Sequence, residues 1–337
     1  MKIAVDAMGG DFAPKAIVSG AIGAARLAKD RFEIVLVGDA EKIQQELEKH
    51  FRTNELPISI VHASQQVEME DIPAIALKRK KDSSIAVAMQ LHKEGVVDAV
   101  VSAGNTGAVL ASALIKLGKI QSVLRPAIGS ILPNGRGATF LIDAGTNVDC
   151  KPRQLYQFGV MGSIFMNRMF SIENPRVALL NIGTETSKGN EQVQATYELF
   201  QKSDLNFVGN IEGGSILQDI SDVVVCDGFV GNIILKFAES FNSVYSTNLR
   251  KRIGKRLQYL VGAYLLKPAF RRLKKTFDYA EYGGVPLLGV KGVVIIGHGS
   301  SSPKAILNAI LEAEKIIKEK VNDKIEDELN IKSAAIL

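Results

Sequence analysis

Cysteine, histidine and tryptophan are scarce in this sequence. Its 337 residues include two cysteines, four histidines and no tryptophan. Cys150 and Cys226 form no Cys-x-x-Cys pair, so we expect no disulfide framework, and a reducing compartment is the natural setting. The histidines are spread along the chain at His50, His62, His92 and His298. This scatter argues against a multi-histidine metal site.

Long apolar runs are also absent. No run approaches the ~20 apolar residues that span a bilayer. Met1 leads directly into a strand-like stretch, without the apolar core or the small-residue cleavage site of a secretory signal. We therefore expect a cytoplasmic protein without membrane-spanning helices.

The standard nucleotide, hydrolase and metalloprotease motifs are missing. There is no G-x-x-x-x-G-K-[ST], no G-x-S-x-G and no H-E-x-x-H. The pair Gly297-x-Gly299 is followed by Ser302 instead of a third glycine, and it lies too near the C-terminus to open a dinucleotide-binding unit. We therefore expect chemistry that uses neither a metal nor a nucleotide cofactor.

Acidic residues are missing from one segment. Between Ser240 and Phe277 there are ten Lys or Arg residues and no Asp or Glu, whereas the rest of the chain has 31 basic and 36 acidic residues. The net charge of +5 therefore comes from a local patch, which argues against a general nucleic-acid binder.

The sequence does contain one repeated pattern: a short apolar run, a turn rich in Gly, Asn, Asp, Ser or Thr, and a helical stretch. Six runs begin such units: Lys2–Val5, Ala99–Val101, Ala138–Ile142, Val177–Leu180, Asp222–Val225 and Gly292–Ile296. Pro14, Pro152 and Pro303 stand where a helix can begin. This alternation predicts an α/β fold with a doubly wound, largely parallel sheet, whose ligands bind beyond the carboxyl ends of the strands.

The chain shows no obvious division into domains. No low-complexity segment or sharp linker interrupts it. We predict one catalytic unit over residues 1–337, made of two intertwined lobes. The charged tail after Glu312 is interpreted as a solvated helix with a frayed end.

Two of the turns are the best candidates for a phosphate site. Glycine lets the backbone approach a ligand closely, and the start of the following helix offers N–H groups and partial positive charge. The predicted phosphate-binding residues are Gly104, Asn105, Thr106, Gly299, Ser300 and Ser301. The alternative is that both segments are ordinary strand-to-helix turns with Ser or Asn caps.

A few side chains could add chemistry to these turns. His298 could contact phosphate or protonate a leaving thiolate, or it could only cap its turn. Lys188 could neutralise a phosphate or be a solvated loop charge. Cys150 has no histidine nearby in sequence, so a nucleophilic role is not expected. Four acidic residues that follow strands could bind metal or orient backbone amides: Asp6, Asp11, Asp143 and Asp149.

The basic segment has an apolar centre. Residues 257–266 are mostly apolar and lie between cationic clusters, and Gly262 and Pro268 can turn the chain. This pattern predicts a helical hairpin within residues 240–277 that carries its apolar residues at the tip. The residues predicted to contact an anionic membrane or an acidic carrier protein are Leu260, Val261, Leu265, Leu266, Arg271, Arg272, Lys274 and Lys275. The alternative is a hairpin at a dimer interface.

Taken in order, the turns resemble those of the phosphate acyltransferase family (PlsX-type). The matching stretches are Asp6–Asp11, Ser102–Ala108, Asn181–Glu185, Gly209–Gly213, Asp227–Asn232, and Tyr282–Gly284 through Gly297–Gly299. The family usually has Val and Ala in place of Ala144 and Thr146. Each stretch is weak alone, but the ordered set covers essentially the whole chain.

The resemblance implies a fold like the isocitrate and isopropylmalate dehydrogenases and phosphotransacetylase, a homodimer, and peripheral association with the inner face of the cell membrane. It implies conversion of acyl-acyl-carrier protein and inorganic phosphate to acyl phosphate, in bacterial phospholipid synthesis. Chemical reasoning then suggests that Asn232 or Asn147 donates to the oxyanion and that Lys188 pairs with phosphate. Two alternatives remain open: an NAD-dependent dehydrogenase of related fold, and a non-catalytic module that binds acyl-carrier protein or a lipid surface.

Overall fold

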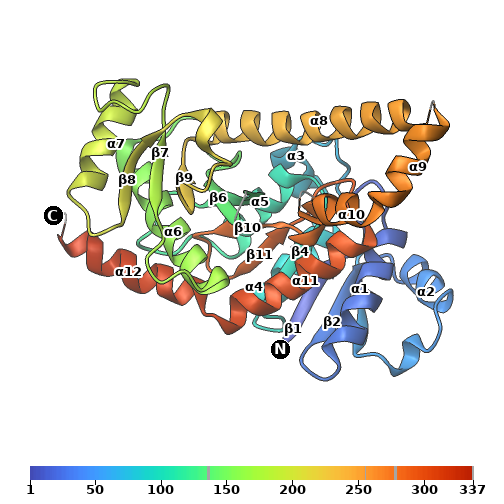
Figure 1. Cartoon of the computed structure of the whole chain (residues 1–337). Coiled ribbons are helices and arrows are strands. Elements are labelled where there is room, and N and C mark those ends of the chain that lie inside the picture. The colour runs from blue at the N-terminus through green and yellow to red at the C-terminus, as the bar shows by residue number, and fades with distance from the viewer. Residues whose placement is uncertain (135–136, 255, 277–278, 336–337) are drawn as a thin grey trace.

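The computed structural model describes residues 1–134, 137–254, 256–276 and 279–335 (Figure 1). Its strands are β1 (Lys2–Asp6), β2 (Glu33–Gly38), β3 (Ile58–His62), β4 (Ala99–Ser102), β5 (Ala127–Pro133), β6 (Ala138–Ile142), β7 (Val177–Leu180), β8 (Phe207–Ile211), β9 (Val223–Val225), β10 (Val285–Leu288) and β11 (Val293–Ile296). They form one sheet in the order β3-β2-β1-β4-β11-β10-β5-β6-β9-β7-β8. Most neighbouring strands are parallel, as the alternating pattern predicts.

Helices lie on both faces of this sheet (Figure 1). They are α1 (Lys15–Ala28), α2 (Ala40–Glu48), α3 (Pro73–Arg79), α4 (Ser84–Lys93), α5 (Thr106–Lys116), α6 (Pro152–Phe170), α7 (Glu191–Gln201), α8 (Gly228–Ile253), α9 (Leu257–Leu265), α10 (Lys267–Thr276), α11 (Pro303–Lys318) and α12 (Val321–Ala335). Within the described part of the chain, no helix is both long enough and apolar enough to cross a membrane.

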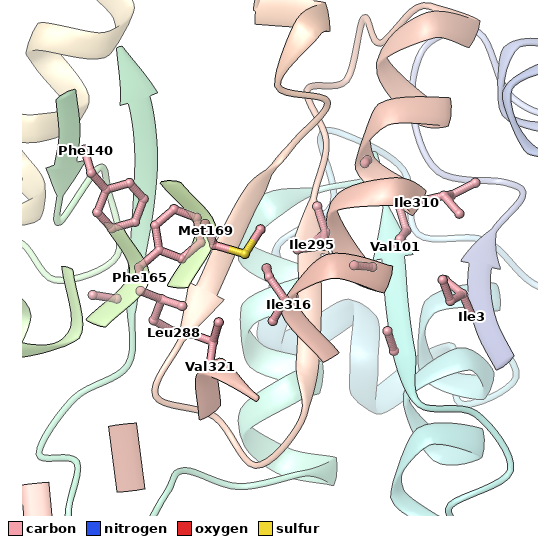
Figure 2. Packing of buried hydrophobic residues seen from close by; sticks show 14 of the residues in the cluster. Ile3, Val101, Phe140, Phe165, Met169, Leu288, Ile295, Ile310, Ile316 and Val321 are labelled. Atoms are coloured by element: carbon pink, nitrogen blue, oxygen red, sulfur yellow. The ribbon is translucent and has the colours of Figure 1, made fainter. Parts of the chain in front are cut away.

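The apolar strands are buried on both faces. Along β1, Ile3 and Val5 face the core formed with α1, α6 and α11, while Ala4 faces the core formed with α4 and α5. On the first face the rings of Phe140 and Phe165 stack with centroids 4.3 Å apart (Figure 2). This two-sided burial explains why the strands are continuously apolar and not alternating.

The tail after Glu312 is not solvated, so the interpretation of this segment was wrong. Helix α12 buries Val321, Ile325 and Leu329 in the main core, next to α6. Its apolar residues recur every fourth position, which places them on one face of a helix. The many charges between them lie on the other face and hide this pattern in the composition.

The direction of the strands reverses within the sheet. Strand β10 is antiparallel to both β11 and β5, and β5 is antiparallel to β6. The section β6-β9-β7-β8 therefore runs opposite to the section β3-β2-β1-β4-β11. As a result, the carboxyl ends of the two parallel sections lie on opposite sides of the sheet, where the strands end. These two rows of strand ends are called its two edges below, and the predicted turns are divided between them.

Helix α8 connects the two edges. It has 26 residues and begins at β9, where the Asp227 carboxylate caps it by accepting a hydrogen bond from the Val230 N–H. Eleven residues later, ~16 Å along the axis, its Glu239 reaches His298 beyond the end of β11. Its early turns pack on the sheet through Val230, Ile234 and Leu235. Its later turns extend along the outside of the molecule, and α9 turns away from its far end (Figure 1).

Candidate active site

Three glycine-rich turns meet at the carboxyl ends of β1, β4 and β11. The N–H of Asp11 donates to the carbonyl oxygen of Gly299, and the N–H of Gly297 donates to that of Ser102, both at 2.8 Å. Gly10 has φ of +101°, and a Cβ there would lie 2.8 Å from the Gly299 oxygen. The close approach therefore requires glycine, and the turns that follow β1, β4 and β11 form one continuous surface.

The Asp6 carboxylate is buried beneath two of these turns. It accepts hydrogen bonds from the Ser102 hydroxyl at 2.7 Å and from the Met8 N–H at 3.2 Å. Burial raises the pKa of Asp6, and hydrogen bonds from the Ser84 and Ser102 hydroxyls oppose this rise. Asp6 thus orients a backbone amide and a hydroxyl, which is one of the two roles predicted for the acidic residues.

Asn105 is the cap of α5. Its Oδ1 accepts from the Ala108 N–H at 3.0 Å, and its Nδ2 donates to the carbonyl oxygens of Met69 and Asp71 at 2.9 and 3.1 Å. The side chain is therefore used within the protein, as the capping interpretation expected. The N–H groups of Thr106 and Gly107 precede the first intrahelical bond, so the helix start itself remains a candidate donor set.

The turn after β11 is arranged around His298. The Ser300 N–H donates to His298 Nδ1 at 3.2 Å, and the Ser302 hydroxyl caps α11 by accepting from the Ala305 N–H at 3.3 Å. Because Nδ1 accepts, the neutral ring carries its proton on Nε2. That atom lies 4.0 Å from the Glu239 carboxylate of α8. His298 therefore both organises its turn and presents a donor at the surface of the site.

The two serines of this turn differ in accessibility. Ser300 is partly exposed and its hydroxyl lies 2.8 Å from His298 Nδ1, whereas the Ser301 side chain is buried. Within the described part of the chain, the Ser301 hydroxyl has no hydrogen-bond partner. Of the two predicted serine ligands, Ser300 is the one that lies at the surface of the turn.

Lys188, Asn147 and Asn232 lie with the opposite edge of the sheet. Both N–H groups of the Asn147 side chain are used, one to the Pro126 carbonyl and one to the Asp143 carboxylate, each at 2.8 Å. Asn232 lies on α8 next to Gly145: a Cβ added to Gly145 would be 3.4 Å from the Cβ of Asn232. Lys188 is an exposed residue of the loop after β7. The reversal of strand direction places Asn147 and Lys188 at the other end of the strands from the three glycine turns, which the repeated pattern alone did not reveal. Asn232 lies on α8 seven residues before Glu239, ~10 Å along the axis.

Asp143 organises the turn after β6, which contains Asn147. Its carboxylate accepts from the N–H groups of Gly145, Thr146 and Asn147 at 2.7 to 3.0 Å. Burial raises the pKa of Asp143, and these hydrogen bonds oppose the rise. Nearby, burial and the charges of Asp143 and Asp227 raise the pKa of Cys150 to about 12. A thiol with that pKa is a poor nucleophile near neutral pH, in agreement with the sequence interpretation.

An exposed apolar rim borders the three glycine turns, and sequence reasoning missed it. Phe12 is 57% exposed in the turn after β1, directly after Asp11. Met69 is 39% exposed, and a Cβ on Gly299 would lie 2.9 Å from its Cε. An aromatic residue inside a polar, glycine-rich turn was the available signal for Phe12. For Met69 no local signal exists, because contacts with a distant segment, such as the hydrogen bonds from Asn105 to the Met69 and Asp71 carbonyl oxygens, bring it to the site.

The described residues offer no ready metal centre. Within that part of the chain, no three His, Cys, Asp or Glu side chains gather closely enough to hold a metal ion. A small cavity of about 10 Å³ instead lies under the turns, lined by Asp6, Val67, Ile85, Ser102, Gly104, Asn105, Ala108 and Val109. The polar groups of the three turns are backbone amides, hydroxyls, the Asp6 carboxyl group and one histidine.

Comparison with known proteins gives a consistent family. Residues 1–324 match the family described as "Fatty acid synthesis protein". The phosphate acyltransferase of Moorella thermoacetica is 49% identical over 95% of this chain and 93% of its own length, and that of Dictyoglomus turgidum is 48% identical over 98% of both.

Solved structures agree on the fold. The EutD phosphotransacetylase from Staphylococcus aureus superposes with a TM-score of 0.60 at 16% identity, covering 95% of this chain and 94% of its own. A putative 4-hydroxythreonine-4-phosphate dehydrogenase from Salmonella typhimurium superposes with a TM-score of 0.52 at 14% identity, covering 94% of this chain and 99% of its own.

Proposed function

The chain belongs to the phosphate acyltransferase family, and on this premise we propose that its three glycine turns bind inorganic phosphate and present it to an acyl thioester. A phosphate oxygen attacks the carbonyl carbon, the carbon–sulfur bond breaks, and acyl phosphate leaves with the free thiol of the carrier protein as the second product. The observation that carries this proposal is the meeting of the turns after β1, β4 and β11 at one edge of the sheet, with the starts of α5 and α11 beside it.

Backbone geometry supplies most of the catalysis in this proposal. Phosphate is already an anion near pH 7, so it needs orientation more than deprotonation. The starts of α5 and α11 each offer N–H groups and partial positive charge to it. The same kind of preorganised donor stabilises the oxyanion that forms on the thioester carbonyl.

His298 assists the departing sulfur. The His298 side chain is 44% exposed, and its Nε2–H, 4.0 Å from the Glu239 carboxylate, can donate to the thiolate as the carbon–sulfur bond breaks. Replacing His298 by alanine should lower kcat about 100-fold or more without unfolding the protein. Steady-state kinetics together with a thermal melt check this, and unchanged kinetics would remove His298 from the mechanism.

The apolar rim receives the acyl chain. The carbon that phosphate attacks carries this chain, so the chain must leave the site beside the turns. Phe12 and Met69 border the turns and expose apolar surface there. Lys188, Asn147 and Asn232 belong to the opposite edge and enter no step of this mechanism.

Helix α8 supports the proposal of a homodimer. Large apolar side chains recur every fourth residue and are more than half exposed: Phe229, Ile233, Phe237, Phe241 and Tyr245. The rings of Phe237, Phe241 and Tyr245 also stack in sequence along the helix. Such a stripe suits the same stripe on a second copy of the chain.

Helices α9 and α10 would form the membrane contact of a cytoplasmic, peripherally bound enzyme. Leu260, Val261, Leu265 and Leu266 are exposed along α9 and its end. Arg271 is exposed on α10, whereas the side chains of Arg272, Lys274 and Lys275 lie outside the described residues. Apolar residues beside cations match the headgroup zone of an anionic membrane.

Neutralising the cationic residues of α10 tests this membrane contact. A variant with Arg271, Arg272, Lys274 and Lys275 replaced by glutamine should sediment less with anionic liposomes at low salt, because about 1 kcal/mol is lost per charge near the surface. A matched variant with four exposed lysines changed elsewhere, at Lys29, Lys93, Lys151 and Lys202, should bind like the wild type. Equal binding by both variants and the wild type would reject the contact.

At the level of architecture, we propose one catalytic unit over residues 1–337 with a fold of the isocitrate and isopropylmalate dehydrogenase type. The superposition on a related dehydrogenase supports this fold and says nothing of the reaction.

A trapping experiment tests the proposed reaction. The protein is incubated with acyl-acyl-carrier protein and inorganic phosphate, and hydroxylamine converts acyl phosphate to hydroxamate. We expect hydroxamate that depends on phosphate, on enzyme and on the thioester. The absence of hydroxamate that depends on phosphate and enzyme, above the direct reaction of the thioester with hydroxylamine, would overturn the proposal and favour a module that only binds its partners.

A further inference from the structure

The carboxyl group of Asp6 is buried beneath the proposed phosphate site, where a negative charge is unfavourable. An ionised Asp6 would repel the bound anion, and few groups are as costly to bury. The Asp6 side chain is only 2% exposed, and burial raises the pKa of Asp6. A simple space-filling role would be served by an apolar residue, so the carboxyl group is present for the hydrogen bonds that it makes.

Those hydrogen bonds tie two separate turns together. Asp6 Oδ1 accepts from the Met8 N–H in the turn after β1, while Oδ2 accepts from the Ser102 hydroxyl at the end of β4. The Ser102 oxygen in turn accepts from the Gly104 N–H at 3.1 Å. A chain of three hydrogen bonds therefore joins residues that lie 96 positions apart in sequence.

The Asp6 carboxyl group also sets how closely the turns after β1 and β4 approach each other. A Cβ on Gly9 would lie 2.6 Å from Asp6 Oδ2 and 2.7 Å from the Gly104 nitrogen. A Cβ on Gly104 would lie 3.4 Å from both Asp6 Oδ2 and the Gly9 Cα. The two glycines thus pack against each other directly over the carboxyl group, and a shift of the group would move both backbones.

We propose that Asp6 is a positioning residue that fixes the spacing of the turns after β1 and β4, acting through Ser102, and so determines the affinity for phosphate. This inference rests on the proposed function, because phosphate binding at these turns is part of it. Asp6 does not touch the reacting atoms. It holds the Gly104 backbone, which leads into the start of α5, in place against the turn after β1.

Kinetics of full-length variants test the proposal. Asp6→Ala should raise the KM for phosphate at least tenfold, with a much smaller change in kcat and in the KM for the acyl thioester. Asp6→Asn should stay within about threefold of the wild-type phosphate KM, because the amide oxygen can accept from the Met8 N–H while the amide nitrogen donates to the Ser102 oxygen. Ser102→Ala should resemble Asp6→Ala, since it removes the link to Gly104.

Asp39 offers a matched control. It follows the neighbouring strand β2 at the same edge, and its carboxylate caps α2 by accepting from the N–H groups of Glu41 and Lys42. Asp39→Ala should lose some stability but keep the phosphate KM. Equal kinetic losses in the Asp39 and Asp6 variants, or an Asp6→Ala loss confined to kcat, would overturn the proposal. Should Asp6→Ala fail to fold, Ser102→Ala decides by the same criterion.

A binding measurement separates this proposal from the proposed reaction. Inorganic phosphate should raise the Tm of the wild type and of Asp6→Asn, and should not raise that of Ser102→Ala, at an ionic strength matched with chloride. Equal phosphate shifts in all variants would refute the positioning role even if acyl phosphate forms. A normal pattern of shifts without hydroxamate would refute the proposed reaction and retain the positioning role.

Discussion

Replacing Gly9 by alanine is expected to lower kcat/KM for phosphate about 100-fold or more while leaving the fold intact. The new methyl group would lie 2.6 Å from the Asp6 carboxylate and 2.7 Å from the Gly104 nitrogen, closer than atoms can approach. The turns after β1 and β4 must therefore separate. A displacement of ~1 Å at a reacting centre can cost about 100-fold in rate.

The backbone at Gly9 does not itself demand glycine. Its φ lies outside the left-handed region, unlike that of Gly10, so alanine adds contact without adding backbone strain. The matched control is Gly214→Ala, where no atom lies within 4 Å of the new carbon. Phosphate kinetics and a thermal melt of both variants provide the measurement. Wild-type kinetics in Gly9→Ala would show that phosphate does not sit over these turns.

Replacing Glu312 by methionine is expected to stabilise the protein by about 1–3 kcal/mol at pH 7.5. The Glu312 carboxylate on α11 is buried, and neither oxygen accepts a hydrogen bond of good geometry among the described residues, although the Gly284 N–H lies nearby. Burial raises the pKa of Glu312 well above its usual value, against the opposing effects of the Gly284 N–H and the Lys315 charge. Methionine keeps an unbranched side chain of similar length and removes the unpaired polar group.

The pH dependence gives this prediction its sign. Below pH ~4.5 the folded and unfolded chains both bind the proton, so the ionisation cost is absent. Above pH ~4.5 the unfolded chain releases the proton while the folded chain retains it, so the stability of the wild type falls as pH rises. The advantage of Glu312→Met should therefore grow from pH 4.5 to pH 7.5.

Two comparisons isolate the cause of this effect. Glu312→Gln should remove the same pH dependence with less stabilisation, because its amide remains unpaired. Replacing the exposed Glu326 by glutamine should change neither. Denaturant unfolding at both pH values measures the free energies. A constant difference between the wild type and Glu312→Met across this range would show that Glu312 is ionised in the folded protein.

The local elements followed from the sequence because their signals are local. The run Ala138–Ile142 and the helix start at Pro152 lie where the apolar pattern and the proline placed them, as does the helix that begins at Pro303. In contrast, α12 was misjudged. Its buried Val321, Ile325 and Leu329 are separated by charges, and only packing against α6 distinguishes a buried stripe from a solvated helix.

Sequence by itself determined the strand–turn–helix units, the glycine turns and the position of the basic segment, because each depends on neighbouring residues. Tertiary structure alone decided which turns share a site. The antiparallel pairs of β10 and β5 reverse the strand direction, which puts His298 at one edge and Lys188 at the other. Strand order depends on contacts between distant segments, and no local pattern of residues encodes it. Another long-range contact, the pairing of β1 with β4, placed Asp6 beneath Gly104.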